Sequence, residues 1–518
     1  MAVSDFLERG ARLNPDAVCI VQGERRHRYR EVRALAWRVA HALLRDADTM
    51  GIARHAAILC GNDATGFACS FGIMRAGWAY VPMDFRNSAD DNAKILDFGD
   101  VDLLFFQAEY AEQVRRLRER LPRLRACVCL DADLTDFASL AQWLADAPES
   151  EPPVEVDAAA TAWLQTGSGT SGDFRMAMQP HRAYNAFVAY SLLWLPDPAP
   201  VMLVAAPITH AAGGLAYPVL AQGGRLVLLD RPDPGAMLEA IERHRVTQLF
   251  LPPTVIYRLM AHPNVRQRDL SSLRYLAFSA APMAVAKLRE AVALFGPIVA
   301  QGYGQTEALG ITCMRPDELL ASDGAIAPDA RLAACGRPAL PFCRVIVMAD
   351  DGTLLPAGEA GEICVRGDQV MTGYYKNEAA TRATLVDGWL HTGDIGRFDD
   401  AGYLHIVDRK KDMIVSGGFN VHSAEIEQAL AEHPAVHEAA VIGVPDDDWG
   451  EAVRAVVVLR AGHEASAVEL IAHCKRRLGS VKAPKAVDFV ADLPRSARGK
   501  VLKRVLRELH WAGRERQV

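Results

Sequence analysis

The 518-residue sequence lacks the features of a membrane-spanning protein or of a disulfide-stabilised extracellular protein. No apolar run approaches the ~20 residues that a membrane-spanning helix needs. The N-terminal stretch MAVSDFLERGARLNPD carries charges where an export signal needs an apolar core, which predicts a cytoplasmic protein. The ten cysteines are scattered and show no C-x-x-C spacing. We therefore expect buried thiols rather than a metal site or disulfides.

The sequence also has no overall excess of positive charge. Its formal net charge is −7, which argues against nucleic acid as a main partner. The charge is uneven, because the stretch from Lys475 to the C-terminus holds 13 basic and 4 acidic residues. Such a basic end is either a solvated helix face or a lid over anionic substrates. Half of the residues are apolar and 23% are charged, the composition of an ordinary soluble protein of several domains.

Apolar periodicity predicts an α/β fold. Residues 28–44 have the spacing of an amphipathic helix, and residues 55–61 that of a buried strand. A second helix is expected at 64–78 and a second strand at 79–84. The same alternation recurs between residues 201 and 279, which predicts a mainly parallel sheet.

The pattern of predicted secondary structure changes in the C-terminal third of the chain. From about residue 340, short strands and turns indicate a small β unit, and helix and strand spacing then resumes near the end. We expect a large N-terminal domain (1–410) that contains this β unit and is hinged to a small α+β lid domain (411–518). The charged run 408–412 is the candidate hinge.

One glycine-rich stretch, LQTGSGTSGDFRMAM (164–178), contains the letters G-x-G-x-x-G of a dinucleotide-binding turn. That turn requires a helix that opens from the glycines, but Pro180 and the alternation in residues 174–178 predict a second strand. The acidic residue about 20 positions on is missing, and no Walker-type Gly-Lys-Ser/Thr follows. The remaining prediction is a strand–turn–strand hairpin. Its backbone N–H groups and hydroxyls either wrap a polyphosphate or form a surface turn.

Eight motifs resemble those of the adenylate-forming superfamily of acyl-CoA synthetases, adenylation domains and luciferases. In chain order they are TGSGTSGDFR, PITHAAG, SAAPM, QGYGQTE, GRPALP, WLHTGDIG, DRKKDMIVSGGFNVHSAEIE and PRSARGKVLKR. The resemblance covers nearly the whole chain. It implies that a carboxylate attacks the α-phosphorus of Mg-ATP to form an acyl-adenylate and pyrophosphate, and that coenzyme A then displaces AMP.

The resemblance implies a nucleotide site assembled from several motifs. The residues expected at the β- and γ-phosphates are Thr166, Ser168, Gly169, Thr170, Ser171, Gly172 and Arg175. The residues expected around the adenine and beside it are Ser279, Ala280, Ala281, Pro282, Gly302, Tyr303, Gly304 and Gln305. Phe174, Arg175 and Met176 stand where the family usually has Pro, Lys and Gly. Arg175 keeps the positive charge and can contact phosphate oxygens through its planar group.

Five polar residues are implied to handle the reacting groups. Thr306 would contact the α-phosphate, and the Glu307 carboxylate would bind Mg²⁺, a hard cation that prefers oxygen. Asp394 would accept hydrogen bonds from the ribose hydroxyls, and Arg409 would contact ribose or phosphate. Lys500 would bridge the substrate carboxylate and the α-phosphate as a compact positive charge. Its neighbour Lys503 is the alternative.

Further positions are implied to form the acyl pocket, the thiol tunnel and the pivot of the lid. His210 would gate the acyl pocket, unless it is a structural core histidine. Gly417 and Gly418 would line the tunnel for the pantetheine of coenzyme A. Lys411 occupies the family's pivot position for lid rotation. Ser423 replaces the proline that the family usually has, and we expect no effect of this replacement.

The function favoured by the sequence is an ATP-dependent acid–CoA ligase for a fatty or aryl acid. No acidic residue lies between Val201 and Gly224 to pair with an α-amino group, which argues against amino-acid substrates. An acyl-AMP ligase that loads a carrier protein remains the alternative, and a luciferase-like monooxygenase would share every motif. A non-catalytic relative is disfavoured because the sequence has all of Glu307, Asp394, Arg409 and Lys500. The oligomeric state stays open.

Overall fold

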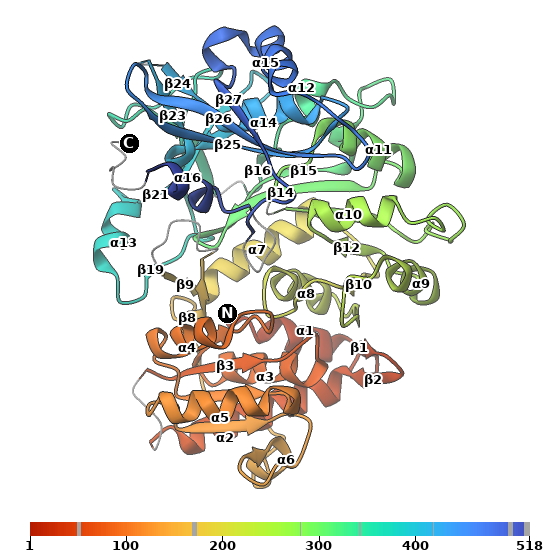
Figure 1. Ribbon diagram of the computed structural model, residues 1–518. Coiled ribbons are helices and arrows are strands. Elements are labelled where there is room, and N and C mark those ends of the chain that lie inside the picture. Colours follow the sequence, from red (N-terminus) through yellow and green to blue (C-terminus); the bar gives the residue numbers. More distant parts are fainter. Residues whose placement is uncertain are drawn as a thin grey trace.

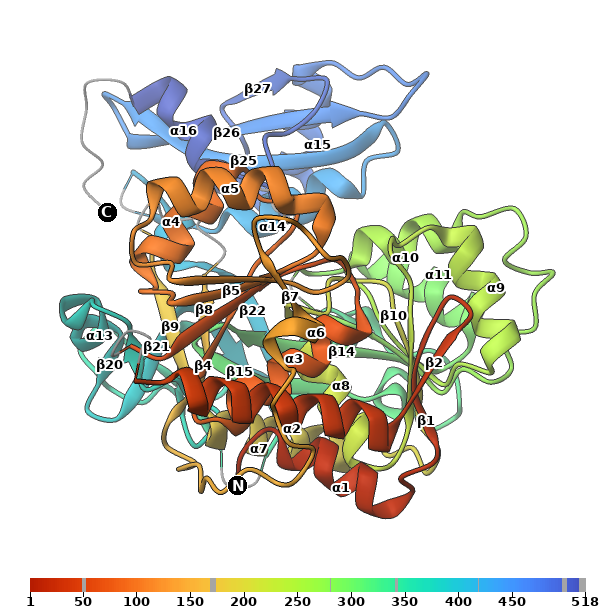
Figure 2. The ribbon, with the colours of Figure 1, turned by 90° about the horizontal axis from the view of Figure 1, so that it is seen from below.

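The computed structural model describes residues 1–48, 53–167, 174–279, 281–340, 343–417, 419–495 and 501–511. Over these residues the chain forms four β-sheets with helices packed on their faces, which Figures 1 and 2 show from two directions. Two large sheets make the body of the protein, a smaller antiparallel sheet extends it, and the fourth sheet belongs to the C-terminal segment. The predicted multidomain α/β fold is confirmed.

The first large sheet has the order β19-β9-β8-β4-β3-β5-β6-β7. Its strands are β3 (His55–Leu59), β4 (Ala79–Pro82), β5 (Leu103–Phe106), β6 (Ala126–Cys129), β7 (Ala138–Ser139), β8 (Thr161–Thr166), β9 (Met176–Pro180) and β19 (Gly373–Tyr374). Its helices are α2 (Tyr29–Asp46), α3 (Ala64–Arg75), α4 (Ala89–Phe98), α5 (Ala111–Arg120) and α6 (Leu140–Trp143). Alternate residues of β3 and β5 enter two separate cores, which explains their continuous apolar sequences.

The second large sheet has the order β16-β15-β14-β13-β12-β10-β11-β1-β2 and is parallel from β14 to β1. Its strands are β1 (Val18–Gln22), β2 (Arg25–Arg28), β10 (Val201–Val204), β11 (Arg225–Leu228), β12 (Gln248–Phe250), β13 (Tyr275–Phe278), β14 (Val299–Gln305), β15 (Ala308–Met314) and β16 (Arg337–Pro338). Its helices are α1 (Asp5–Leu13), α7 (His181–Trp194), α8 (Ala211–Ala221), α9 (Pro234–His244), α10 (Pro253–Met260), α11 (Val285–Phe295) and α12 (Asp329–Leu332).

One hydrophobic core joins the two large sheets. It contains residues of β3 and β5 from the first sheet, β10 and β11 from the second, and α1, α2, α3, α7 and α8. Its largest side chains, among them Trp78, Trp163 and Tyr217, have less than 2% of their surface exposed. Burial of large apolar surface stabilises such a contact by ~25 cal/mol per Å², so the two sheets form one body.

The small antiparallel sheet confirms the predicted β unit. Its strands are β17 (Arg344–Met348), β18 (Gly361–Arg366), β20 (Leu385–Val386), β21 (Trp389–Phe398) and β22 (Leu404–Arg409), with α13 (Glu378–Thr384) before β20. Strand β21 is long and lies between β18 and β22. It carries the segment Thr392–Asp394 towards the second large sheet, where Tyr303 contacts Asp394.

The C-terminal segment has its own sheet and its own core. The strands are β23 (Ile414–Ser416), β24 (Phe419–Val421), β25 (Val436–Asp446), β26 (Gly450–Leu459) and β27 (Ala486–Phe489). The helices are α14 (Ser423–Ala431), α15 (Ala467–Lys482) and α16 (Lys503–Trp511). The blue elements of Figures 1 and 2 lie together at one end of the molecule. A short helix, η3 (Lys410–Asp412), precedes them. The boundary at 410/411 stays a prediction.

The cysteines are buried thiols, as the sequence predicts. All ten are buried and none forms a disulfide. Among the described residues, no group of three or more His, Cys, Asp or Glu side chains could hold a metal ion. The same residues contain no helix that is long and apolar enough to cross a membrane.

Candidate active site

The SAAPM and QGYGQTE motifs lie side by side at the carboxyl ends of parallel strands. Phe278 of β13 is paired with Gln301 of β14, so the residues that follow each strand position are neighbours. A Cβ atom built on Gly302 would lie 4.0 Å from the Cβ of Ser279. Ligands of open α/β sheets bind at this edge of the sheet. Gly304 and Gln305 continue along β14, and Ala281 and Pro282 are exposed after β13.

Tyr303, Asp394 and Arg409 form one polar cluster. The Tyr303 hydroxyl donates a hydrogen bond of 2.7 Å to Oδ2 of Asp394. Arg409 pairs with Asp394 across β21 and β22, and its Nε lies 3.4 Å from Oδ1. Burial and the neighbouring carboxylate raise the pKa of Tyr303 well above its ordinary value, so its phenol stays a donor. The cluster presents an oriented carboxylate beside the glycines of β14.

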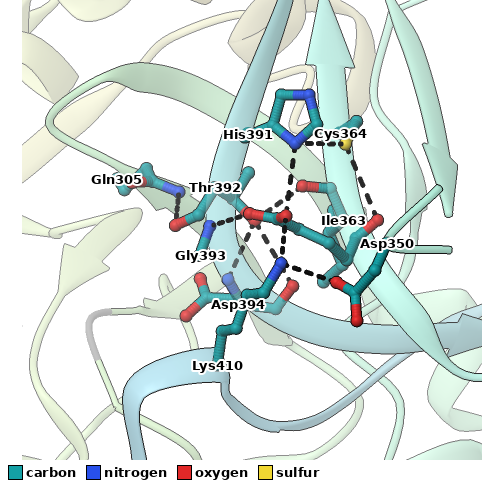
Figure 3. A network of polar contacts seen from close by, with 10 residues as sticks. Gln305, Asp350, Ile363, Cys364, His391, Thr392, Gly393, Asp394 and Lys410 are labelled. Atoms are coloured by element: carbon teal, nitrogen blue, oxygen red, sulfur yellow. Dashed lines mark hydrogen bonds and ion pairs between the residues drawn. The ribbon is translucent and has the colours of Figure 1, made fainter. Parts of the chain in front are cut away.

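The segment that carries Asp394 is fixed by β18, as Figure 3 shows. The Thr392 hydroxyl donates to the Ile363 carbonyl at 2.7 Å, and the Gly393 N–H donates to the Glu362 carboxylate at 3.0 Å. The Gln305 amide donates to the Thr392 carbonyl at 3.3 Å, which connects this segment to β14. The position of Asp394 is therefore set from both sheets.

Thr306 and Glu307 form the two-residue turn of the β14–β15 hairpin, because Gln305 pairs with Ala308. The Thr306 carbonyl accepts a hydrogen bond of 2.6 Å from Nε2 of Gln179. The Glu307 carboxylate accepts a hydrogen bond of 2.8 Å from the hydroxyl of Tyr374. A two-residue turn held at both positions can present a hydroxyl and a carboxylate to one ligand.

The two strands that flank the glycine-rich stretch pair as the sequence predicts. Strands β8 and β9 are antiparallel with Thr166 opposite Met176, and helix α7 begins only after Pro180. Thr166 is buried at the end of β8. The Arg175 guanidinium carbon lies 5.4 Å from the centre of the Tyr374 ring. The positions predicted to bind phosphate between the strands lie outside the described residues; they are Ser168, Gly169, Thr170, Ser171 and Gly172.

His210 precedes helix α8 and has an acidic neighbour that the sequence argument did not include. Its Nδ1 lies 3.0 Å from the Thr209 hydroxyl. Burial raises the pKa of Asp84, but hydrogen bonds from Arg86 and the nearby His210 outweigh burial and lower it below its ordinary value. Arg86 holds both Asp84 oxygens, at 2.9 and 2.7 Å. Because this carboxylate is already paired, it is a poor partner for a substrate ammonium group.

The contacts of the candidate hinge change on either side of Lys411. Lys410 donates to Asp350 at 2.8 Å and to Glu362 at 3.2 Å, both in the β unit, and Figure 3 shows the first of these contacts. Asp412 instead accepts a hydrogen bond of 2.8 Å from Arg507 of α16. Lys411 is thus the residue between the two sets of partners, which is the arrangement that a pivot needs.

Ser423 has a structural role that the sequence did not predict. Its backbone N–H and its hydroxyl both donate to the Asp408 carboxylate, the hydroxyl at 2.9 Å from Oδ2. Lys503 donates to the Ser423 hydroxyl at 2.8 Å and forms a 2.7 Å ion pair with Glu427. A proline at 423 could not donate from its nitrogen. Lys503 is engaged here, which leaves Lys500 as the candidate for the substrate.

The remaining predicted tunnel and lysine positions are only partly described. Gly418, Lys500 and Ala280 lie outside the described residues. Gly417 has a φ of +58°, and a Cβ there would lie 2.4 Å from the Trp449 ring. Both the backbone conformation and the ring therefore require glycine at 417.

Lys411 should make stability depend on pH. Burial, helped by the cations Arg409 and Arg507, lowers the pKa of Lys411 to about 8, against an ordinary value of 10.5. Between these two values the unfolded chain binds more protons than the folded one, so the contribution of Lys411 to stability rises with pH. Relative to Lys411→Met, the unaltered chain should gain stability from about pH 7.5 to about pH 9.5. Urea unfolding of both proteins at the two pH values measures this difference, and a constant difference would contradict the burial of Lys411.

A divalent cation could bind at this site only if phosphate oxygens supplied part of its coordination. Among the described residues no cluster of acidic, histidine or cysteine ligands could hold a metal alone. Mg²⁺ is commonly bound through one or two carboxylates together with substrate phosphates and water. Glu307, exposed enough to reach a ligand and fixed by Tyr374, matches that donor set.

Comparisons with known proteins agree with this geometry. The AMP-binding enzyme family model matches residues 7–375, and the AMP-binding enzyme C-terminal domain model matches residues 425–500. The chain therefore belongs to the AMP-binding enzyme family, which confirms the predicted superfamily.

Two curated relatives are acid–CoA ligases. A feruloyl-CoA synthase of Amycolatopsis sp is 36% identical over 510 residues that cover 96% of each chain. The medium/long-chain-fatty-acid–CoA ligase FadD8 of Mycobacterium tuberculosis is 43% identical over 327 residues, 62% of this chain and 56% of that protein. ATP-bound MatB from Rhodopseudomonas palustris superposes with a TM-score of 0.87 at 29% identity, covering 98% of this chain and 99% of that one. The chain is an enzyme of the acyl-CoA synthetase class.

The structure adds residues that motif matching missed. Tyr374 and Gln179 donate hydrogen bonds to predicted site residues, and Asp84 interacts electrostatically with His210, but each comes from a distant part of the chain. Tyr374 lies 67 positions from its partner Glu307, and Gln179 lies 127 positions from Thr306. No spacing rule connects such pairs, because β9 and β19 pair in the first large sheet while β14 belongs to the second, and the strands meet only through tertiary packing.

Proposed function

We propose that the protein is an ATP-dependent ligase that joins a neutral fatty or aryl carboxylic acid to coenzyme A in two steps. The observation that carries this proposal is the placement of Asp394, Arg409 and Tyr303 next to the Thr306–Glu307 turn. This arrangement supplies a ribose acceptor, a cation and a metal-binding carboxylate within one site. The family membership supports the same reaction.

In the first step an oxygen of the substrate carboxylate attacks the α-phosphorus of ATP, and the bond to the β,γ-pyrophosphate breaks. The protein mainly positions charged groups for such a reaction. Asp394 holds the ribose, Thr306 orients the α-phosphate, and Arg175 attracts the leaving phosphates. Mg²⁺, held by Glu307 and the phosphates, would neutralise negative charge there. Lys500 is proposed to bridge the two reacting anions.

In the second step the thiolate of coenzyme A attacks the acyl carbonyl carbon, and AMP leaves with the electrons of the acyl–oxygen bond. The lid is proposed to turn about Lys411 between the two steps. The contacts support this pivot, since Lys410 is attached to the β unit and Asp412 to α16. Turning would bring Gly417 and Gly418 to the pantetheine tunnel. Such motions concentrate in a few residues whose backbone angles change.

The acid is proposed to be uncharged apart from its carboxylate. Residues 201–224 contain no acidic side chain, and Asp84 beside His210 is paired with Arg86. The named relatives act on aryl and fatty acids, which supports both substrate classes. Cytoplasmic location and a role in fatty-acid metabolism remain part of the proposal.

A panel of carboxylic acids tests the proposed function. With ATP and Mg²⁺, neutral aryl and fatty acids should release pyrophosphate, and addition of coenzyme A should yield a thioester. α-Amino acids should give no release above background, because Asp84, the carboxylate beside His210, is already paired with Arg86 and is a poor partner for a buried ammonium. Pyrophosphate release and thioester mass are the two measurements. Adenylate formation without any thioester would instead favour the carrier-protein alternative, and activation of an amino acid would refute the substrate class.

A further inference from the structure

Tyr374 is a buried side chain at the edge of the first large sheet. Strand β19 pairs antiparallel with β9, and Tyr374 lies opposite Ala177, two positions after Arg175. Its backbone N–H donates to the Thr381 hydroxyl at 2.9 Å. The preceding Gly373 leaves no room for a side chain, since a Cβ there would lie 2.8 Å from the Thr381 methyl group. Tyr374 as a whole is only 7% exposed, so little space remains for its ring to change direction.

The segment around Tyr374 holds Glu307 at two points. The Met371 N–H donates to the Glu307 carbonyl at 2.9 Å, and the Tyr374 hydroxyl donates to Oε1 of the carboxylate at 2.8 Å. One contact fixes the backbone of the turn and the other fixes the rotation of the side chain. A carboxylate oxygen that accepts a phenol hydrogen bond leaves the second oxygen for another ligand.

The face of the same ring meets Arg175. The guanidinium carbon lies 5.4 Å from the ring centre, within the range of a cation–π contact. A planar guanidinium can stack on a ring and still point donors elsewhere, which a lysine ammonium does less well. Arg175, which stands where the family usually has lysine, can therefore stack on Tyr374 and still donate hydrogen bonds to a ligand.

We propose that Tyr374 is a positioning residue that connects the metal-binding carboxylate of Glu307 to the phosphate-binding cation Arg175. Its hydroxyl orients the Glu307 carboxylate and its ring face orients the Arg175 guanidinium. Both groups are therefore in place before Mg-ATP binds. This inference rests on the proposed function, because it assigns Glu307 and Arg175 to Mg-ATP.

The test is Tyr374→Phe, which removes the hydroxyl and keeps the ring. Binding of Mg-ATP, measured by calorimetry without any acid, should weaken about tenfold, the usual size of one lost hydrogen bond to a charged group. Binding of ATP with excess chelator should stay the same, because Glu307 then has no metal to hold. In turnover, the Mg²⁺ requirement should rise while the KM for the acid stays unchanged.

Tyr375→Phe is the matched control. The neighbouring Tyr375 also donates to a carboxylate, Asp100, at 2.7 Å, but within the described part of the chain its ring partners are His55, Phe98 and Lys376, none of them a predicted site residue. Its removal should leave Mg-ATP binding unchanged. Equal Mg-ATP affinity of Tyr374→Phe and the unaltered enzyme would overturn the proposal, as would equal losses with and without Mg²⁺. Calorimetry needs no turnover, so an enzyme that binds Mg-ATP but activates no acid would refute only the proposed function.

A double-mutant cycle tests the second half of the connection. Arg175→Lys and Tyr374→Leu each remove the stacked contact. The fold loss of Mg-ATP affinity in the double variant should therefore be smaller than the product of the fold losses in the two single variants. Fully multiplicative effects would overturn the link between the ring and Arg175.

Discussion

Asp394→Ala should raise the KM for ATP by about tenfold to a hundredfold, the range expected when a buried group loses a charged hydrogen-bond partner. Three groups depend on this carboxylate. The Tyr303 hydroxyl donates to it, Arg409 pairs with it across β21 and β22, and the proposed ribose hydroxyls would bind to it. Removing the carboxylate therefore also releases two residues of the nucleotide site. Initial rates of pyrophosphate release at several ATP concentrations measure the effect.

Asp394→Asn separates the two contributions. An amide oxygen can still accept from Tyr303, but the side chain carries no charge for Arg409. The KM for ATP should lie between those of Asp394→Ala and the unaltered enzyme. Tyr303→Phe removes only the phenol hydrogen bond and serves as the control for orientation of the carboxylate. Unchanged ATP kinetics in Asp394→Ala would remove this residue from the nucleotide site.

Much of the fold follows from patterns within short windows of sequence. The apolar residues at 55–61 predict a buried strand, and alternate residues of β3 indeed enter two separate cores. Pro180 predicts that no helix opens from the glycines, and α7 indeed begins after it. These predictions succeed because the chemistry that decides them lies within a few residues.

Other features depend on contacts that no local pattern records. The sequence places no acidic residue at 201–224, which predicts an acyl pocket without a carboxylate. In the structure, however, Asp84 at the end of β4 lies close enough to His210 to interact with it electrostatically. The sequence predicts no effect of the serine at 423 and no partner for it, whereas in the structure its N–H and hydroxyl donate to Asp408. Both contacts join different elements of the fold, and their residues carry no spacing that connects them.

The Asp408–Ser423 contact spans the proposed pivot. Asp408 belongs to β22, before Lys411, while Ser423 begins α14, after it. All the hydrogen bonds between them must break if the lid turns. The side chains are buried, with Asp408 6% and Ser423 0% exposed, so little water competes for these bonds. The contact should therefore favour the lid position seen here over the turned one.

Ser423→Pro should shift the lid towards the turned position. The substitution removes the N–H and the hydroxyl donors to Asp408 together and takes one acceptor from Lys503. The fold should survive, because Ser423 is the first residue of α14, where proline is well tolerated. Hydrogen bonds to a charged group contribute ~1.5–3 kcal/mol each, so a change of about tenfold or more in the lid equilibrium is expected.

The two half-reactions measure this shift. The half-reaction that uses the present lid position should slow in Ser423→Pro, and the one that uses the turned position should speed up where lid turning limits its rate. Ser423→Ala keeps the backbone N–H and loses only the hydroxyl, so it should change both rates in the same directions by less. Acyl-adenylate formation and thioester formation from supplied adenylate are followed separately in each protein.

A parallel loss in both half-reactions would indicate general damage to the lid, and unchanged rates in Ser423→Pro would show that Asp408 does not hold the lid. If the Asp408–Ser423 contact holds the lid, the two half-reaction rates should change in opposite directions, and the changes should be larger in Ser423→Pro than in Ser423→Ala.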